Sequence, residues 1–250
     1  MTNTLRSRLL AGDNAIGTVC TLGSIEAMEI AAAAGLHFIL ADWQHGSFDR
    51  DLMREAVRAM DATDCHAIAR PPSDDLYLIQ WLLDMGYLSL LIPMVNTPEQ
   101  ARAVVASSYY PPRGERSQAT TRAALRHGSD YREHVNGELL VVVMIETVEA
   151  VDNIEAIAAI DGITGCFVGG TDLASSMGIK GDKPAPPEFE AAVARVREAT
   201  VAAGKVAAIA APDGDKARSR IDEGFDMVTA GSDIRMLCTA MSAAMNGLRE

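Results

Sequence analysis

The amino-acid sequence predicts a (β/α)8 TIM barrel, an α/β fold in which eight parallel strands alternate with helices. Short apolar segments of strand length recur eight times along the 250 residues, and a helical pattern follows each of them. The strand segments are also nearly continuous in apolar residues, as expected for parallel strands that are buried on both faces. An open doubly wound sheet is the competing topology.

Each predicted strand is a short run rich in Val, Ile, Leu or Ala. In chain order the eight runs are Ile16–Cys20, His37–Ala41, His66–Ala69, Leu88–Ile92, Leu139–Ile145, Ile163–Val168, Val206–Ile209 and Met227–Ala230.

The segments that follow these runs carry the helical spacing of apolar residues. Ser24 can cap the first predicted helix, and Gly35, Gly86 and Gly204 follow helix ends, where glycine tolerates a left-handed turn. In chain order the predicted helices are Ser24–Ala34, Arg50–Met60, Asp75–Met85, Pro98–Ser107, Val148–Ala159, Pro187–Ala203, Asp215–Glu223 and Asp233–Leu248.

Two connections are longer than ordinary loops. Residues 109–137 contain YYPPRGERS, and residues 169–187 contain GGTDLASSMGIKGDKPAPP. Long loops in compact domains are often functional, so we expect both to lie on the active face of the barrel. Because no internal repeat, low-complexity tract or interdomain linker appears, residues 1–250 are predicted to form one domain.

The composition argues against several classes of partner. With a formal net charge of −12 and a pI of about 4.8, the chain offers no basic footprint for nucleic acid or an acidic membrane. The longest apolar runs are too short to cross a bilayer, and the N-terminal residues do not resemble a signal peptide. The unpaired spacing of the four cysteines favours buried, reduced thiols in a cytoplasmic protein. These cysteines are Cys20, Cys65, Cys166 and Cys238.

Polar side chains follow four of the predicted strands, at the end where barrel enzymes build their active sites. Although they are distant in sequence, the fold predicts that they face one opening. They are Asp42, Gln44 and His45 after the second strand, Arg70 at the end of the third, Glu146 at the end of the fifth and Asp172 after the sixth.

Glu146 and Asp172 are suited to a hard divalent cation. Mg²⁺ or Mn²⁺ takes one or two carboxylates and leaves its other positions to water and substrate. A 2-oxo acid can fill two of those positions with a carboxylate oxygen and its keto oxygen. The alternative is that Glu146 caps the following helix or pairs with an arginine.

A histidine and an arginine complete the predicted chemistry. His45, with an intrinsic pKa of about 6.5, could abstract a proton with Asp42 orienting it; an exposed loop histidine is the alternative. Arg70 could bind an anionic substrate or a developing enolate, and a salt bridge to a neighbouring carboxylate is the alternative. His37 and His66 begin strands, so we expect them on the opposite face in structural roles. No lysine ends a predicted strand, which disfavours Schiff-base catalysis.

Seven short motifs occur in order along nearly the whole chain. They are D-x-x-H at Asp42 and His45, ARP at Arg70, LLD at Asp84, LLIPMV at 90–95, YPPRGER at 110–116, IET at Glu146 and DLASSMG at 172–178. In these motifs the sequence resembles the HpcH/HpaI aldolase family, metal-dependent (class II) aldolases that use pyruvate-like nucleophiles.

The resemblance implies both an assembly and a set of roles. The last helix of the barrel would be exchanged between subunits of a hexamer, a trimer of dimers. Asp84, at the end of a predicted helix on the opposite face, would support the histidine of an adjacent subunit. The implied metal is Mg²⁺ or Mn²⁺, with Co²⁺ or Zn²⁺ as alternatives. The implied roles are metal ligand for Glu146 and Asp172, base for His45, enolate stabiliser for Arg70, and oxo-acid contact for the backbone of Gly170 and Thr171.

Three residues depart from the family pattern. Trp43 stands where many members have Gly, Gln44 where many have Glu, and Met144 where relatives often have Gln. Gln44 can still hydrogen-bond a metal-bound water, but it adds no negative charge. We expect the three departures to reshape the oxo-acid and aldehyde pockets.

The sequence therefore predicts a divalent-metal-dependent aldolase that cleaves or forms 4-hydroxy-2-oxo acids through a metal-stabilised enolate. Its substrates would be pyruvate or hydroxypyruvate and an aldehyde. One alternative is a CoA-ester lyase resembling the citrate lyase β subunit, although no basic cluster is present to bind CoA. The other is a non-catalytic oxo-acid-binding protein, which the presence of His45, Arg70 and both carboxylates argues against.

Overall fold

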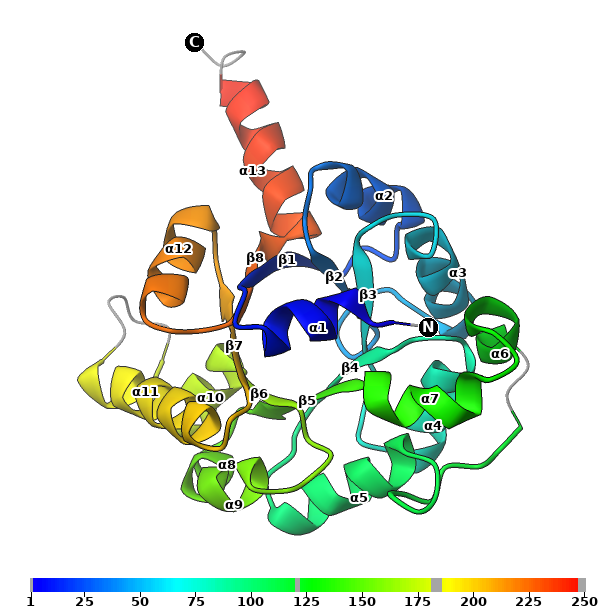
Figure 1. Ribbon diagram of the computed structural model, residues 1–250. Coiled ribbons are helices and arrows are strands. Elements are labelled where there is room, and N and C mark those ends of the chain that lie inside the picture. The colour runs from blue at the N-terminus through cyan, green and yellow to red at the C-terminus, as the bar shows by residue number, and fades with distance from the viewer. Residues whose placement is uncertain (1, 120–121, 181–185, 247–250) are drawn as a thin grey trace.

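The eight strands close into a parallel barrel, in the order β1 to β8, which confirms the predicted fold and rules out the open sheet (Figure 1). The computed structural model describes residues 2–119, 122–180 and 186–246. The observed strands lie within two or three residues of the predicted runs. They are β1 Ala15–Cys20, β2 Phe38–Asp42, β3 His66–Arg70, β4 Ser89–Ile92, β5 Leu140–Ile145, β6 Gly165–Val168, β7 Val206–Ala211 and β8 Met227–Ser232.

All the predicted helices are present, although the one predicted over 148–159 divides at Asn153, whose side chain donates to the carbonyl oxygen of Asn96. Ser24 caps its helix as predicted, since its hydroxyl accepts the N–H of Ala27. In chain order, the helices at the predicted positions are α2 Ile25–Ala33, α3 Arg50–Met60, α4 Leu76–Asp84, α5 Pro98–Ser108, α8 Val148–Asp152, α9 Ile154–Ala158, α11 Pro187–Ala202, α12 Gly214–Asp222 and α13 Asp233–Asn246.

Four further helices were not predicted: α1 Thr4–Leu10, α6 Arg122–His127, α7 Tyr131–Glu138 and α10 Gly170–Ser176. Each has eight residues or fewer, too short for a helical repeat of apolar positions to stand out. No described helix is both long and apolar enough to span a membrane.

Alternate residues of each strand belong to two separate cores. On β2, Phe38 and Leu40 pack inside the barrel, while Ile39 and Ala41 pack between the barrel and its helices. The same division holds on β5, where Met144 is an interior residue. This alternation decides which side chains can meet at the ends of the strands.

Helix α1 closes the amino end of the barrel, where Figure 1 shows it lying across the opening. Leu5 and Leu9 are buried in the interior core. Asn3 anchors the helix, because its amide donates to the carbonyl oxygens of Leu88 and Glu138. The amino ends of the strands thus serve stability, as is usual in this fold.

The two long connections lie at opposite ends of the barrel. Residues 169–180 follow β6 and so belong to the carboxyl ends, as predicted, and residues 181–185 of this connection lie outside the described residues. Residues 109–137 follow α5 and lead into β5, so the prediction for this segment was wrong. Its Arg113 pairs with Asp161 at 2.7 Å, and the Tyr109 hydroxyl donates to the Gly162 carbonyl oxygen, both between α9 and β6. Whether a connection follows a strand or a helix decides at which end of the barrel it lies, and its length does not.

The remaining predictions concern histidines and cysteines. His37 and His66 lie at the amino ends as expected: His37 Nδ1 accepts the N–H of Ile16, and His66 Nε2 contacts the Thr4 hydroxyl. All four cysteines are free. Three are buried, whereas Cys238 on α13 is exposed because that helix buries none of its side chains.

Replacing Leu9 with alanine should destabilise the protein by about 2–4 kcal/mol, because Leu9 is 4% exposed and its loss leaves a cavity inside the barrel. Leu10→Ala, on the same helix and 50% exposed, is the control and should cost well under 1 kcal/mol. Urea unfolding measures both. Equal losses for the two variants would show that α1 does not contribute to the interior core.

Candidate active site

An ion pair joins the ends of β2 and β3. Asp42 and Arg70 are the last residues of these strands and are paired in register. Arg70 Nε donates to Asp42 Oδ1 at 2.8 Å and Nη2 donates to Oδ2 at 2.6 Å, which is a bidentate pair. The Asp42 side chain is 1% exposed and that of Arg70 is 13% exposed. The salt bridge considered as the alternative for Arg70 is therefore present, and it fixes the plane of the guanidinium.

The third nitrogen of Arg70 takes no part in this pair. Nη1 lies 3.8 Å from the sulfur of Met144, which points into the barrel from β5. A thioether is a weak acceptor, so Nη1 keeps its capacity to bind an anion.

Asp42 also shapes the turn that carries His45. Its Oδ1 accepts the backbone N–H of Gln44 at 3.1 Å and that of His45 at 3.2 Å. Asp42 therefore positions His45 through the backbone, while the paired contact of its carboxylate is with Arg70. The His45 side chain is exposed to solvent.

Glu146 directly follows β5 and is 1% exposed. Its Oε1 accepts the backbone N–H of Met94 at 2.7 Å, whereas its buried Oε2 has no hydrogen-bond partner among the described residues. It is not the cap of α8, because Thr147 takes that place by accepting the N–H of Ala150. A buried carboxylate oxygen without a partner is costly, which points to a ligand that the oxygen is meant to meet.

The electrostatic balance at Glu146 shows which groups share the site. Burial raises the pKa of Glu146, and the negative charge of Asp172 raises it further. The Met94 N–H and the nearby positive charges of Arg70 and His45 lower it. The carboxylates, the guanidinium and the imidazole expected from sequence are thus close enough to influence one another.

Asp172 lies in the first turn of α10 with Gly170 and Thr171, and it is exposed. Its negative charge acts on Glu146, so the two carboxylates share the carboxyl end of the barrel. A hard divalent cation fits such a pair, because it uses one or two carboxylates and keeps several waters. The described residues contain no cluster of three or more His, Cys, Asp or Glu side chains that could hold a metal ion. The donors present therefore suit an open site that water and substrate complete.

The three departures from the family pattern occupy different positions. Gln44 is half-buried, and its Oε1 is buried with no partner within the described part of the chain. Trp43 packs against Trp81 of α4, with ring centroids 5.9 Å apart, in the layer between barrel and helices. The structure therefore brings Met144, but not the ring of Trp43, to the side of the sheet that holds Asp42 and Arg70.

Asp84 is not brought to this group within the chain. It ends α4, and its Oδ1 accepts a hydrogen bond from Nη2 of the fully buried Arg116 at 2.8 Å. Burial raises the pKa of Asp84, and Arg116 opposes that shift. This pair belongs to the amino ends of the strands, as the helix pattern predicted for Asp84.

Sequence comparison identifies the family. The family described as HpcH/HpaI aldolase/citrate lyase matches residues 21–240. The chain belongs to this family.

Similar proteins carry aldolase names. A hydroxypyruvate/pyruvate aldolase of Cupriavidus necator is 35% identical, over 99% of this chain and 93% of its own. A 4-hydroxy-2-oxovalerate aldolase of Rhodococcus jostii is 37% identical, over 96% and 94% respectively. The crystal structure of an HpcH/HpaI aldolase/citrate lyase family protein from Burkholderia cenocepacia superposes with a TM-score of 0.94, at 32% identity, over the whole of both chains. Aldolases are lyases, and the family fits a metal-dependent aldolase.

Two residues of this family member's site escaped sequence reasoning. Met94 contributes only its backbone N–H, for which the residue type carries no signal. Gly169 leaves room beside Glu146, since a Cβ at that position would lie 2.4 Å from Oε2. Gly169 therefore lies against the carboxylate itself.

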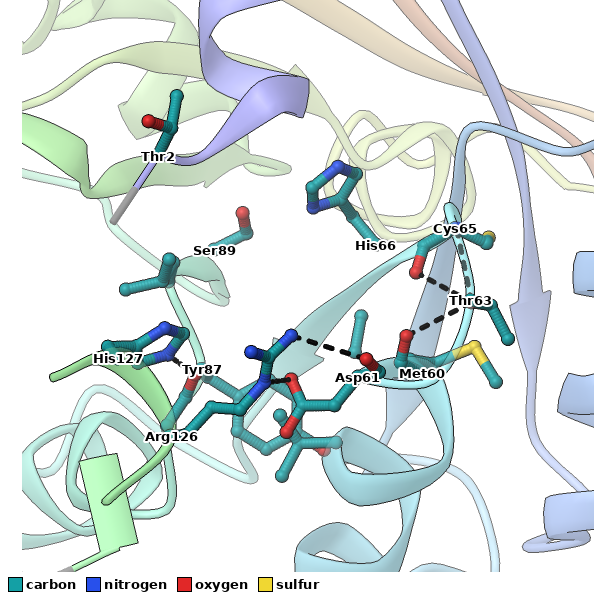
Figure 2. Close-up of a pocket in the computed structure, with 14 residues that line it drawn as sticks. Thr2, Met60, Asp61, Thr63, Cys65, His66, Tyr87, Ser89, Arg126 and His127 are labelled. Atoms are coloured by element: carbon teal, nitrogen blue, oxygen red, sulfur yellow. Dashed lines mark hydrogen bonds and ion pairs between the residues drawn. The ribbon is translucent and has the colours of Figure 1, made fainter. Parts of the chain in front are cut away.

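A separate cavity of about 360 Å³ lies at the other end of the barrel (Figure 2). It is lined by the start of β3, the segment before β4 and the end of α3, with His66, His127 and Arg126 among its residues. Arg126 pairs with Asp61 there at 3.0 Å. None of the site residues lines this cavity, so its size does not mark the place of the chemistry.

Glu146→Gln should raise the stability of the metal-free protein at pH 7. Burial holds the pKa of Glu146 above its ordinary value of 4.5, so the folded chain binds this proton more tightly and loses stability as the pH rises above that value. The amide removes the buried charge, and we expect a gain of about 1 kcal/mol, or about 2–4 °C in Tm. Calorimetry in EDTA measures it, with the exposed Glu149→Gln as control; a lower Tm than wild type contradicts the burial argument.

Proposed function

We propose that this chain is a divalent-metal-dependent aldolase that cleaves or forms 4-hydroxy-2-oxo acids. The nucleophile would be a pyruvate-like 2-oxo acid (pyruvate or hydroxypyruvate), and its partner would be an aldehyde. One observation carries the proposal: a buried, unpaired carboxylate oxygen of Glu146 stands close to Asp172, Arg70 and His45 at the carboxyl ends of the strands. The aldolase names of the relatives support the same reaction class.

Glu146 and Asp172 would hold the cation, with Mg²⁺ or Mn²⁺ the best suited to oxygen ligands and Co²⁺ or Zn²⁺ as alternatives. When bound, such an ion supplies Lewis acidity to the 2-oxo acid. The backbone of Gly170 and Thr171, at the start of α10, would contact the carboxylate of that acid.

Arg70 would place its charge where negative charge develops on the keto oxygen. Asp42 occupies Nε and Nη2, so Nη1 is the donor left for the substrate. A donor fixed in advance stabilises a developing oxyanion more than one that must be ordered during the reaction. Asp42 is thus catalytically useful as the residue that orients Arg70.

His45 would move the proton, directly or through a water. In the synthetic direction it accepts a proton from C3 of the oxo acid, and in cleavage it accepts the proton of the 4-hydroxyl group. Its exposure leaves the imidazole accessible to both a substrate and a neighbouring subunit.

Substrate preference would depend on Gln44 and Met144. The unpaired Oε1 of Gln44 can accept a hydrogen bond from a water or a substrate hydroxyl, without adding charge. Met144 puts an apolar thioether next to Arg70, where an amide would offer hydrogen bonds. The ring of Trp43 faces Trp81, so Trp43 would influence the substrate only indirectly, through the conformation of the turn that carries Gln44 and His45.

The assembly would be a homo-oligomer, a hexamer arranged as a trimer of dimers, in which α13 is exchanged. Helix α13 buries none of its side chains and extends away from the barrel in Figure 1. Asp84 would then support His45 of an adjacent subunit. The chain would form one catalytic domain, and free cysteines are consistent with a cytoplasmic enzyme. The exposed apolar residues of α13 are Ile234, Met236, Leu237, Met241 and Met245.

EDTA should abolish aldol activity, because the Lewis acid supplies most of the enolate stabilisation. Turnover of hydroxypyruvate or pyruvate with an aldehyde should fall at least about 100-fold in chelator and return when Mg²⁺ or Mn²⁺ is added in excess. The assay follows loss of the oxo acid with wild-type protein before and after chelation. Full activity in EDTA would exclude the metal mechanism.

Charged substitutions on α13 should break the assembly. Leu237→Glu combined with Met241→Glu places two charges on a face that would be buried between subunits, so sedimentation velocity should show a smaller species than wild type. Leu125→Glu on α6, at a residue 83% exposed, is the matched control and should leave the assembly intact. A monomeric wild-type protein, or an unchanged double variant, would count against helix exchange.

A further inference from the structure

Met94 has a backbone conformation that its side chain does not favour. Its φ is +57°, in the left-handed region, and among the described residues every other positive φ belongs to a glycine. Non-glycine residues adopt this conformation mainly when the surrounding structure imposes it, and such residues cluster at functional sites. The Met94 side chain is 42% exposed, so burial of that side chain does not explain the conformation.

The loop after β4 is fixed on the C-terminal side of Met94. Asn96 donates its N–H to Gln100 Oε1 at 2.8 Å, and Gln100 also belongs to the capping box that opens α5. The Asn96 Oδ1 accepts the hydroxyl of Thr147 at 2.6 Å, which ties the loop to the residue next to Glu146. These contacts hold the loop where the left-handed turn at Met94 aims its N–H at Glu146.

The consequence of this turn is that the two oxygens of Glu146 differ. Oε1 accepts the Met94 N–H at 2.7 Å and is thereby held in a fixed position. Oε2 is buried, has no partner among the described residues, and lies against Gly169, where a Cβ would be only 2.4 Å away. A carboxylate held in this way has a fixed orientation, and Oε2 is its oxygen without a protein partner.

We propose that Met94 is a positioning residue: its left-handed backbone aims its N–H at Oε1 and so sets the orientation in which Glu146 presents Oε2 to the divalent cation. The inference rests on the proposed function. A carboxylate that is held in place before the cation arrives loses less freedom on binding, so a fixed Glu146 would bind the cation more tightly. Met94 acts through Glu146 and has no contact of its own with the reacting atoms in this account.

A graded series at Met94 tests the backbone role. Met94→Gly and Met94→Asn accept the left-handed conformation, Met94→Ala tolerates it about as methionine does, and the β-branched Met94→Val disfavours it strongly. Mn²⁺ is titrated into each metal-free protein and the free ion is read by electron paramagnetic resonance. Gly, Asn and Ala variants should bind Mn²⁺ within about twofold of wild type, and the Val variant about tenfold more weakly.

Two controls separate this effect from general damage. Thermal unfolding shows that each variant is folded, and Leu125→Val makes the same kind of change at an exposed residue of α6. Should Met94→Val not fold, Met94→Thr, which is β-branched and more polar, takes its place with the same expected loss.

The possible results are distinguishable. Equal Mn²⁺ affinity in all variants would overturn the inference while leaving the proposed function intact. An equal loss in the Gly, Asn and Val variants would also overturn it, because the methionine side chain would then matter instead of the backbone. Wild-type protein that binds no Mn²⁺ would remove both the inference and the metal-dependent function.

Discussion

Closure of eight parallel strands into a barrel forces every second side chain into one shared interior, and the candidate site depends on this constraint. Leu40, Ile68 and Met144 are interior residues of β2, β3 and β5. Two positions further along each strand the next inward side chains are Asp42, Arg70 and Glu146, at the carboxyl ends. There the apolar interior ends, so these charged side chains can be buried against one another and against backbone groups. The candidate site therefore lies at the carboxyl ends of the strands, where the inward-facing positions carry charged side chains.

Within this group, each hydrogen bond that supports the fold also decides what remains for a substrate. Asp42 takes two of the three nitrogens of Arg70, and Met94 takes one of the two oxygens of Glu146. The groups without such a partner are Nη1, which attracts an anion, and Oε2, which attracts a cation. Burial raises the pKa of Glu146, so metal-free protein holds that carboxylate at an energetic disadvantage that a cation would remove. The site is therefore assembled for a charged ligand before one arrives.

The sequence was informative about strands and side chains, and much less so about backbone groups and direction. Parallel strands such as β5 are apolar on both faces and so stand out from their surroundings, which explains the close match of their bounds. The positions of Arg70 and Glu146 at strand ends were also correctly predicted, because a charged residue stands out where an apolar run stops. The role of Met94 could not be found, since any residue but proline supplies a backbone N–H. Trp43 is one residue after the inward-facing Asp42, so its outward direction could have been predicted. Residues 109–137 come between a helix and the next strand, so their place at the amino end of the barrel could also have been predicted.

Two features of the chain make little sense in an isolated barrel. Arg116 is fully buried at the amino ends, where desolvation of a charge is costly, and it is committed to holding Asp84. Helix α13 carries one isoleucine, one leucine and three methionines that the described residues leave 47–61% exposed. A second copy of the chain could cover the exposed side chains of α13. Arg116 would then orient Asp84 toward His45 of a neighbouring subunit and not toward His45 of the same chain. On this view His45 is exposed because its environment is completed by another subunit, and proton transfer would depend on assembly as well as on the metal site.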